Sequence, residues 1–271
     1  MDAGKTRVDR VPEGYYTYCS AAFFMAPRQR RGVALLFLAA SSGLSADGKP
    51  NFVVLVLDDA ALMDLGAYGG EARTPNVDAL AERGAMFTNY QTSPLCSPSR
   101  SMLLTGIDNH RTGVATIAEV LPPSMKGKPG YSLTLEPGVV TVASRLQSAG
   151  YRTYMTGKWH LGHADGDAAH LPSSHGFDRH YALDASGADN WEQKPYMPYY
   201  QEAPWFEDGR KATLPSDFYS SKFVVDKMVE YLDGNSSTTP FFAYIAFQVC
   251  AATATQLQPL QLVVDRIWNG R

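Results

Sequence analysis

Two uninterrupted runs of apolar, β-prone residues constrain the fold of this chain more than any other feature of its sequence. Residues 52–57 and 241–247 contain no alternating polar positions. Such continuity is typical of strands buried on both faces, as in a parallel sheet. A parallel sheet requires helices over both of its faces. The sequence therefore predicts an α/β domain with a mostly parallel sheet flanked by helices on both faces.

Periodicity and turn residues predict the remaining elements. Pro75 fits the first turn of a helix, and Gly84 fits its C-terminus. Residues 107–138 are predicted to be rich in loops, with Pro122-Pro123 and Pro129-Gly130 among them. Residues 161–215 contain many Gly, Pro and aromatic residues, which predicts irregular loops around a cleft. The expected helices are 76–83, 96–106, 139–149 and 218–232, and the further expected strands are 85–90 and 151–156.

The N-terminal region has the layout of a secretory signal. Basic residues at 28–31 precede a short apolar run at 32–40, and small residues then lead to Asp47. The run is too short to span a bilayer, although a buried strand or helix is an alternative interpretation. We expect an N-terminal extension and signal peptide at 1–46, with Met25 a more natural start than the first residue. We also expect an exported protein (periplasmic, secreted or in the lumen of the secretory pathway) without a stable membrane span.

Charge and cysteine content exclude some classes of function. The formal net charge of −3 gives no general attraction to nucleic acid or to anionic membranes. The three cysteines, Cys19, Cys96 and Cys250, show no spacing typical of a metal clip or a disulfide framework.

Two adjacent acids follow the first apolar run. The carboxylates of Asp58 and Asp59 repel each other unless a cation holds them, and hard oxygen donors favour calcium or magnesium. Neighbouring side chains in a strand point to opposite faces, so both can reach one ion only where the strand has given way to a turn. A solvated turn is the alternative interpretation.

Cys96 precedes an expected helix and lies one turn before Arg100. A helix N-terminus suits an anion, and a guanidinium on the same face can hydrogen-bond an oxyanion bidentately. The pattern predicts an anion site with a nucleophile at its centre, and a buried structural thiol is the alternative.

Lys158 and His160 follow the expected strand at 151–156. They point the same way if the strand persists, so that one supplies a charge for an anion and the other a proton donor or acceptor. A surface lysine and an ordinary histidine are the alternative. Ligands of open α/β sheets bind beyond the carboxyl ends of strands, so we expect these residues and the acid pair to share one cleft.

Four segments of the chain, in order, resemble the signatures of the sulfatase family. The C-x-P-x-R pattern at 96–100 resembles the first signature, and 150–162 resembles the second. Segments 54–59 and 74–81 resemble the N-terminal block of the family. The resemblance covers roughly 49–249.

The resemblance implies an alkaline-phosphatase-like α/β fold and an arylsulfatase-like sulfuric ester hydrolase. It implies that a separate formylglycine-generating maturation enzyme oxidises Cys96 to formylglycine. It further implies that Asp58, Asp59 and the modified Cys96 bind calcium. It also implies a small-molecule or glycan sulfate ester as the substrate class.

The resemblance also implies catalytic roles for four residues. The hydrated formylglycine at Cys96, a gem-diol, attacks sulfur and expels the alcohol. Arg100 holds the diol, Lys158 bridges diol and sulfate, and His160 takes the proton for elimination of sulfate.

The resemblance ends near residue 249. Family members continue with a Pro-His segment, a later Asp-Asn pair, a sulfate-binding lysine and a small subdomain, whereas here no histidine follows His180. We therefore expect a catalytic domain at 47–249 that is truncated, with the C-terminal subdomain missing and an aberrant or divergent tail at 250–271. The missing oxygen ligands weaken the expected calcium site.

Two other functions stay open at this point. One is a phosphonate or phosphate monoester hydrolase of the same superfamily, although Cys96 within C-x-P-x-R favours the sulfatase. The other is an inactive truncated remnant.

Overall fold

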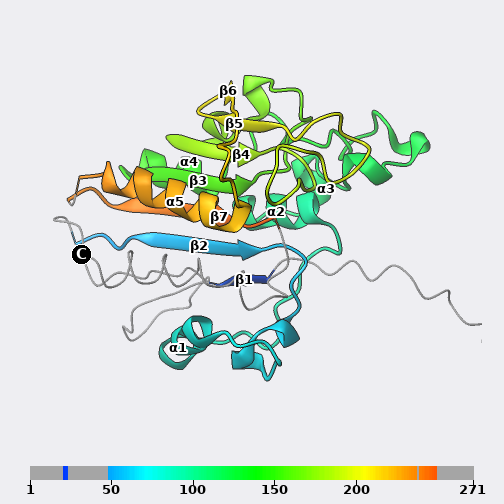
Figure 1. Ribbon diagram of the computed structural model, residues 1–271. Coiled ribbons are helices and arrows are strands. Elements are labelled where there is room, and N and C mark those ends of the chain that lie inside the picture. The colour runs from blue at the N-terminus through cyan, green and yellow to red at the C-terminus, as the bar shows by residue number, and fades with distance from the viewer. Residues whose placement is uncertain (1–20, 24–47, 237, 249–271) are drawn as a thin grey trace, which may run out of the picture.

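Within the residues that the structure describes (21–23, 48–236 and 238–248 of a computed structural model), seven strands form one sheet (Figure 1). Their order across the sheet is β1-β2-β7-β3-β4-β5-β6. The strands are β1 Ala21–Phe23, β2 Phe52–Leu57, β3 Arg152–Lys158, β4 Arg179–Leu183, β5 Trp205–Glu207, β6 Arg210–Lys211 and β7 Phe241–Ala246.

The four central strands, β2, β7, β3 and β4, run parallel, as the apolar runs predict. Val54 of β2 lies opposite Tyr244 of β7, which in turn lies opposite Met155 of β3. The short strands β1, β5 and β6 join the two edges in antiparallel pairings. The predicted mostly parallel sheet is confirmed.

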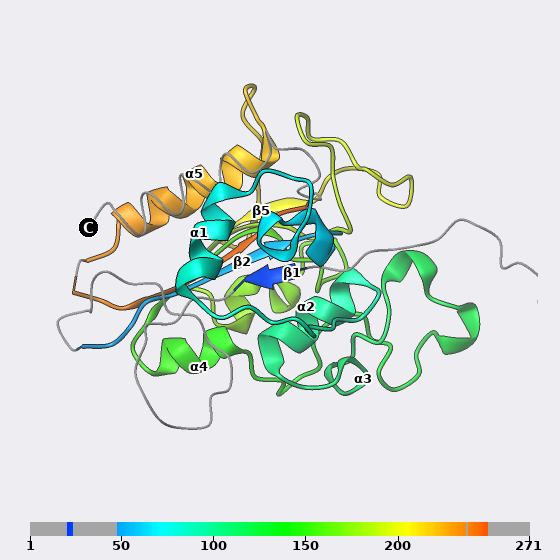
Figure 2. The same ribbon diagram turned by 90° about the horizontal axis from the view of Figure 1, so that it is seen from below.

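Helices cover both faces of this sheet. Figure 2 shows α1 and α5 on one side of the strands and α2, α3 and α4 on the other. Alternation along β2 explains the division, because Val53 and Leu55 pack in the core with α5, whereas Val54 and Val56 pack in the core with α2 and α4. The helices are α1 Pro75–Arg83, α2 Cys96–Thr105, α3 Asn109–Thr112, α4 Val142–Ser148 and α5 Ser220–Asp233, and the short 3₁₀ turns are η1 Leu62–Asp64, η2 Gly66–Tyr68, η3 Ala118–Val120, η4 Pro123–Met125, η5 Ala168–His170 and η6 Pro172–His175.

Two predictions about these elements are wrong. Residues 85–90 form no strand; they run as turns and irregular chain, with Met86 exposed. The segment 161–215 is not wholly irregular, because β4, β5 and β6 lie within it. These short strands have no long apolar run, and pairing with their neighbours defines them.

Several predicted boundaries also move by one to three residues. The helix expected from residue 139 begins at Val142, because the Thr141 side chain accepts the backbone N–H of Ser144 at 3.0 Å and caps it. The strand expected to end at residue 156 continues through Gly157 to Lys158.

Several sequence-based expectations concern residues outside the described ones. These are the signal peptide (apart from Ala21–Phe23), Cys19, Cys250 and the tail at 250–271. The helices in the described part of the chain are all too short or too polar to cross a bilayer.

His180 in β4 makes the stability of the fold depend on pH. Its side chain is fully buried, its Nε2 accepts the backbone N–H of Gly209 at 3.2 Å, and burial lowers its pKa to about 4. The unfolded chain binds a proton at this histidine below about pH 6.5. The free energy of unfolding should therefore fall between about pH 6.5 and 4, by up to about 1.4 kcal/mol per pH unit from this residue.

Denaturant unfolding of the wild type and of His180→Gln at about pH 7 and about pH 5 checks this prediction. The variant should lose less stability on acidification, and an equal loss in both proteins would contradict it.

Candidate active site

The predicted site residues converge beyond the carboxyl ends of the parallel strands, where such sheets bind ligands. Asp58 follows β2, and Lys158 is the last residue of β3. Cys96 and Arg100 come from α2, which lies beside the arrowheads of these strands in Figure 1. Asp58, Lys158 and Arg100 are in direct contact there, and Asp59 and Cys96 lie beside Asp58.

Asp58 lies between two buried cations. The Lys158 ammonium contacts Asp58 Oδ2, Arg100 Nη2 lies 3.4 Å from Asp58 Oδ1, and none of the three side chains is more than 3% exposed. Burial acts to raise the pKa of the carboxyl, but Lys158 and Arg100 together hold it below its ordinary value. One carboxylate facing two cations leaves a net buried charge of +1, which favours an anion nearby.

Asp59 lies beyond the end of the strand, where the side chains of Asp58 and Asp59 can both reach one ion. β2 ends at Leu57, and Asp59 has a left-handed backbone with φ 54°. Burial and the neighbouring Asp58 raise the pKa of the Asp59 carboxyl. One donor atom from each of Asp58, Asp59 and Cys96 lies within 4.8 Å of the other two.

Cys96 is the first residue of α2, and no side chain from Leu95 caps the helix. Burial raises the pKa of the Cys96 thiol, and Lys158 offsets this in part. The unmodified thiol is therefore neutral near pH 7 and is a weak nucleophile.

Arg100 is buried with unsatisfied hydrogen-bonding capacity. Its Nη1 donates to the carbonyl oxygen of Lys158 at 2.6 Å, while Nε and Nη2 make no hydrogen bond within the described part of the chain. Buried donors in native proteins almost always have a partner. Nη2 has only the ion pair with Asp58 Oδ1, and Nε has no partner among the described residues, so this guanidinium one turn from Cys96 indicates a site for an oxygen acceptor.

The backbone conformation at His160 differs from the one expected. β3 ends at Lys158, and His160 has a left-handed backbone with φ 53°, so the prediction based on a persisting strand is wrong. Burial lowers the pKa of His160 to about 4, and Glu119 opposes this effect. The imidazole is therefore neutral near pH 7 and able to accept a proton.

Sequence reasoning missed two residues that contact His160 directly or indirectly. Glu119 Oε1 lies 3.6 Å from His160 Nε2, and the Tyr200 hydroxyl donates to the same oxygen at 2.5 Å. Burial acts to raise the pKa of Glu119, but His160 and Tyr200 hold it down at about 2. Both residues come from segments expected to be irregular loops, and no motif marks them.

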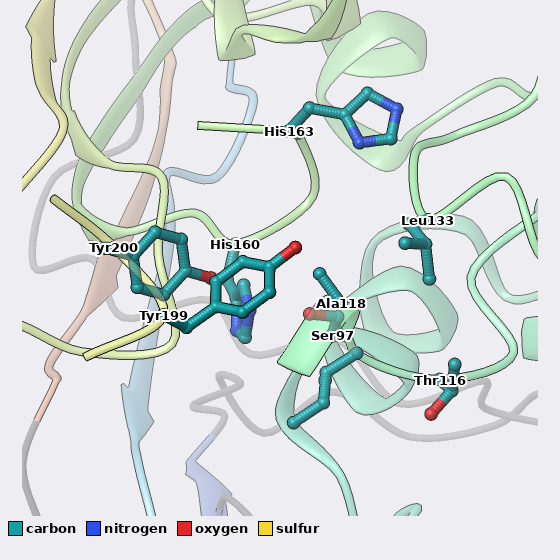
Figure 3. Close-up of a pocket in the computed structure, with 10 residues that line it drawn as sticks. Ser97, Thr116, Ala118, Leu133, His160, His163, Tyr199 and Tyr200 are labelled. Carbon is teal, nitrogen blue, oxygen red and sulfur yellow. The ribbon is translucent and has the colours of Figure 1, made fainter. Parts of the chain in front are cut away.

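A small pocket opens beside His160, with a cavity volume of about 60 Å³. Figure 3 shows His160 beside Tyr199 and Tyr200, with Ser97 and Ala118 across from them. Ser97 directly follows Cys96, so the pocket adjoins the proposed nucleophile position. The lining residues are Ser97, Thr116, Ile117, Ala118, Leu133, His160, Gly162, His163, Tyr199 and Tyr200.

The donor set suits calcium once position 96 carries an oxygen. Asp58 and Asp59 supply hard carboxylate oxygens, and a divalent cation would relieve the repulsion that raises the pKa of Asp59. A thiol is a soft donor, whereas an oxygen at Cys96 would match the carboxylates. Three protein donors are fewer than the six to eight oxygens that calcium takes, so the full site needs further ligands.

Comparison with known proteins agrees with this geometry. The family model described as Sulfatase matches residues 50–250. The chain therefore belongs to the sulfatase family.

The relatives are longer than this chain. An arylsulfatase of Klebsiella aerogenes is 35% identical over 219 residues, which cover 78% of this chain and 45% of the relative. An uncharacterised sulfatase of Schizosaccharomyces pombe is 37% identical over 209 residues, covering 73% of this chain and 37% of the relative. The chain thus spans less than half the length of each.

A solved structure shares the fold. BT4656, in complex with its substrate D-glucosamine-2-N,6-O-disulfate, is 27% identical and superposes with a TM-score of 0.55 over 73% of this chain and 34% of that one. The likeness confirms the expected alkaline-phosphatase-like α/β fold.

Proposed function

We propose that this chain is the N-terminal catalytic part of a sulfuric ester hydrolase that uses formylglycine at Cys96 and calcium. The observation that carries the proposal is the buried Arg100 guanidinium, whose Nε makes no hydrogen bond among the described residues and whose Nη2 has only the 3.4 Å ion pair with Asp58. They lie at the helix that begins with Cys96, beside Asp58 and the rest of the acid pair.

Two groups that the structure does not contain would supply the central chemistry. Asp58, Asp59 and an oxygen at position 96 would hold calcium, which would supply Lewis-acid polarisation of the sulfate, and formylglycine at Cys96 would supply an oxygen nucleophile in place of the thiol. The chain's own residues set up the electrostatics around them.

Arg100 and Lys158 place positive charge where negative charge develops on the transferring sulfate. Because these two cations outnumber the one carboxylate that they contact, that of Asp58, the cluster of the three side chains is positive before substrate binds. This arrangement stabilises the negative charge that develops on the sulfate group in the transition state. Neutral His160 accepts the proton that must leave the oxygen at position 96.

The pocket supports a substrate with a ring on its alcohol side. Tyr199 and Tyr200 form one wall, and Ile117 and Leu133 contribute apolar surface. BT4656 binds a sulfated amino sugar. We propose a small-molecule or glycan sulfate ester as the substrate class of the present chain.

The mass of the Cys96 peptide is the first test. After co-expression with a formylglycine-generating enzyme, the peptide should show the exchange of H₂S for O, and Cys96→Ala should not. The matured protein should then hydrolyse an aryl sulfate, with activity lost by at least about 1,000-fold in Cys96→Ala.

The same assay separates the alternatives. Faster hydrolysis of a phenylphosphonate ester than of the aryl sulfate would favour the phosphonate hydrolase. Complete maturation without either activity would favour an inactive remnant.

We also propose that the protein is exported and that its mature form begins near Asp47. The basic and apolar segments at 28–40 support this proposal. N-terminal sequencing of the protein recovered from its native host tests it, and retention of residues before 40 would contradict it.

A further inference from the structure

We propose that Glu119 is a positioning residue that fixes the tautomer of His160, with the proton on Nε2 and the lone pair on Nδ1. The catalytic use of that lone pair rests on the proposed function. The tautomer itself does not, so the two ideas can fail separately.

The contact between the two side chains sets the tautomer. His160 Nε2 lies 3.6 Å from Glu119 Oε1, and the side chains are only 5% and 2% exposed. The separation is longer than a hydrogen bond, so attraction across it is electrostatic at this distance. A carboxylate attracts an N–H and repels a lone pair, and little water is present to screen either effect. The proton therefore belongs on Nε2.

Glu119 is itself held in place from the far side of the pocket. The Tyr200 hydroxyl donates to Glu119 Oε1 at 2.5 Å, across 81 residues of sequence. A carboxylate that accepts a short hydrogen bond from a phenol stays ionised and keeps one orientation. Tyr200 also lines the pocket beside His160, so the same tyrosine forms part of the pocket wall and anchors the residue that orients the base.

The other nitrogen of His160 is left available. Nδ1 is buried and makes no hydrogen bond within the described residues. An unpartnered buried nitrogen is rare and calls for a role. As the lone-pair nitrogen of a neutral imidazole, Nδ1 can accept a proton, whereas in the opposite tautomer it could only donate one.

The charged groups around His160 act in opposite directions. Lys158 and Arg100 disfavour a protonated imidazole, while Glu119 favours it. Glu119 therefore has two effects: it orients the neutral ring, and it offsets part of the positive field when the ring takes up a proton.

The test is the tautomer of His160 in the 271-residue chain, read from long-range ¹H–¹⁵N spectra of histidine-labelled protein near neutral pH. His160→Gln assigns the signal by its loss. In the wild type, Nε2 should give a protonated-nitrogen shift and Nδ1 a lone-pair shift. In Glu119→Gln the amide oxygen can keep the hydrogen bond from Tyr200, but the charge that holds the proton on Nε2 is lost, so both tautomers should appear.

Tyr200→Phe keeps the aromatic wall but removes the anchor. This variant should give a mixture of the two tautomers. A wild-type spectrum with the proton on Nδ1, or a spectrum unchanged in Glu119→Gln, would overturn the inference.

Activity of the matured protein supplies a second readout. Glu119→Gln should lower kcat by about 100-fold with little change in KM, because it alters the proton acceptor and leaves substrate contacts in place. A changed tautomer balance in Glu119→Gln with unchanged kcat would overturn the catalytic use of Nδ1. A changed tautomer balance in a chain that matures but hydrolyses nothing would support the positioning role of Glu119 and count against the proposed function alone.

Discussion

Asp58→Asn should lower the free energy of unfolding by about 3–5 kcal/mol, measured by denaturant titration in the presence of a chelator. Asp58 is the carboxylate between Lys158 and Arg100, and all three side chains are buried. The substitution keeps the shape of the side chain but raises the net buried charge from +1 to +2. Two cations without a counterion in a medium of low polarity repel each other and lose hydration.

The neighbouring aspartate provides the matched control. The Asp59 residue is exposed, but partial burial of its carboxyl and the neighbouring Asp58 raise its pKa, so its charge is unfavourable in the absence of a metal. Asp59→Asn should therefore change the free energy of unfolding by less than about 1 kcal/mol under the same conditions. Equal losses in the free energy of unfolding would show that the ion pairs of Asp58 with Lys158 and Arg100 are not what makes Asp58 important for stability.

Gly157→Ala should destabilise the fold by about 4 kcal/mol or more, or prevent recovery of folded protein. Gly157 lies in β3 with φ 95°, and a Cβ atom there would lie 1.9 Å from the carbonyl oxygen of Ala246 in β7. That oxygen belongs to the backbone of a central parallel strand, so it cannot move without separating β3 from β7. The damage would occur next to Lys158.

Gly209→Ala separates steric clash from backbone strain. Gly209 has a similar φ of 84°, but a Cβ atom there has no neighbour within 4 Å. This variant should lose about 1–2 kcal/mol from the left-handed conformation alone. Similar losses of stability in the two variants would contradict the clash in β3. Failure to recover folded Gly157→Ala, when Gly209→Ala is recovered as soluble protein, would be the strongest result in favour of the clash.

Local chemistry explains which parts of the site could be predicted from the sequence. Asp58 follows an apolar run that identifies its strand, and Cys96 and Arg100 are four residues apart on one helix. Within such short spacings, the geometry of strands and helices decides which side chains meet. The family resemblance added the roles of these residues.

Some contacts required the folded chain. Glu119 and Tyr200 meet His160 from two separate loops, and neither lies in a pattern that marks it. The left-handed backbone at Asp59 and His160 also has no local signature, because non-glycine residues adopt it only where the surrounding structure stabilises it. The inferred lone pair on His160 Nδ1 depends on the contact between Glu119 and His160 Nε2.

The sequence by itself determined the class of fold, the strands β2 and β7, and the ends of α1 at Pro75 and Gly84. It could do so because an uninterrupted apolar run or a capping residue carries its information locally. Tertiary structure alone decided β4, β5 and β6, whose short strands exist through pairing. It also decided the charge balance around Asp58, because that balance depends on side chains up to 100 residues apart meeting in a site that excludes water.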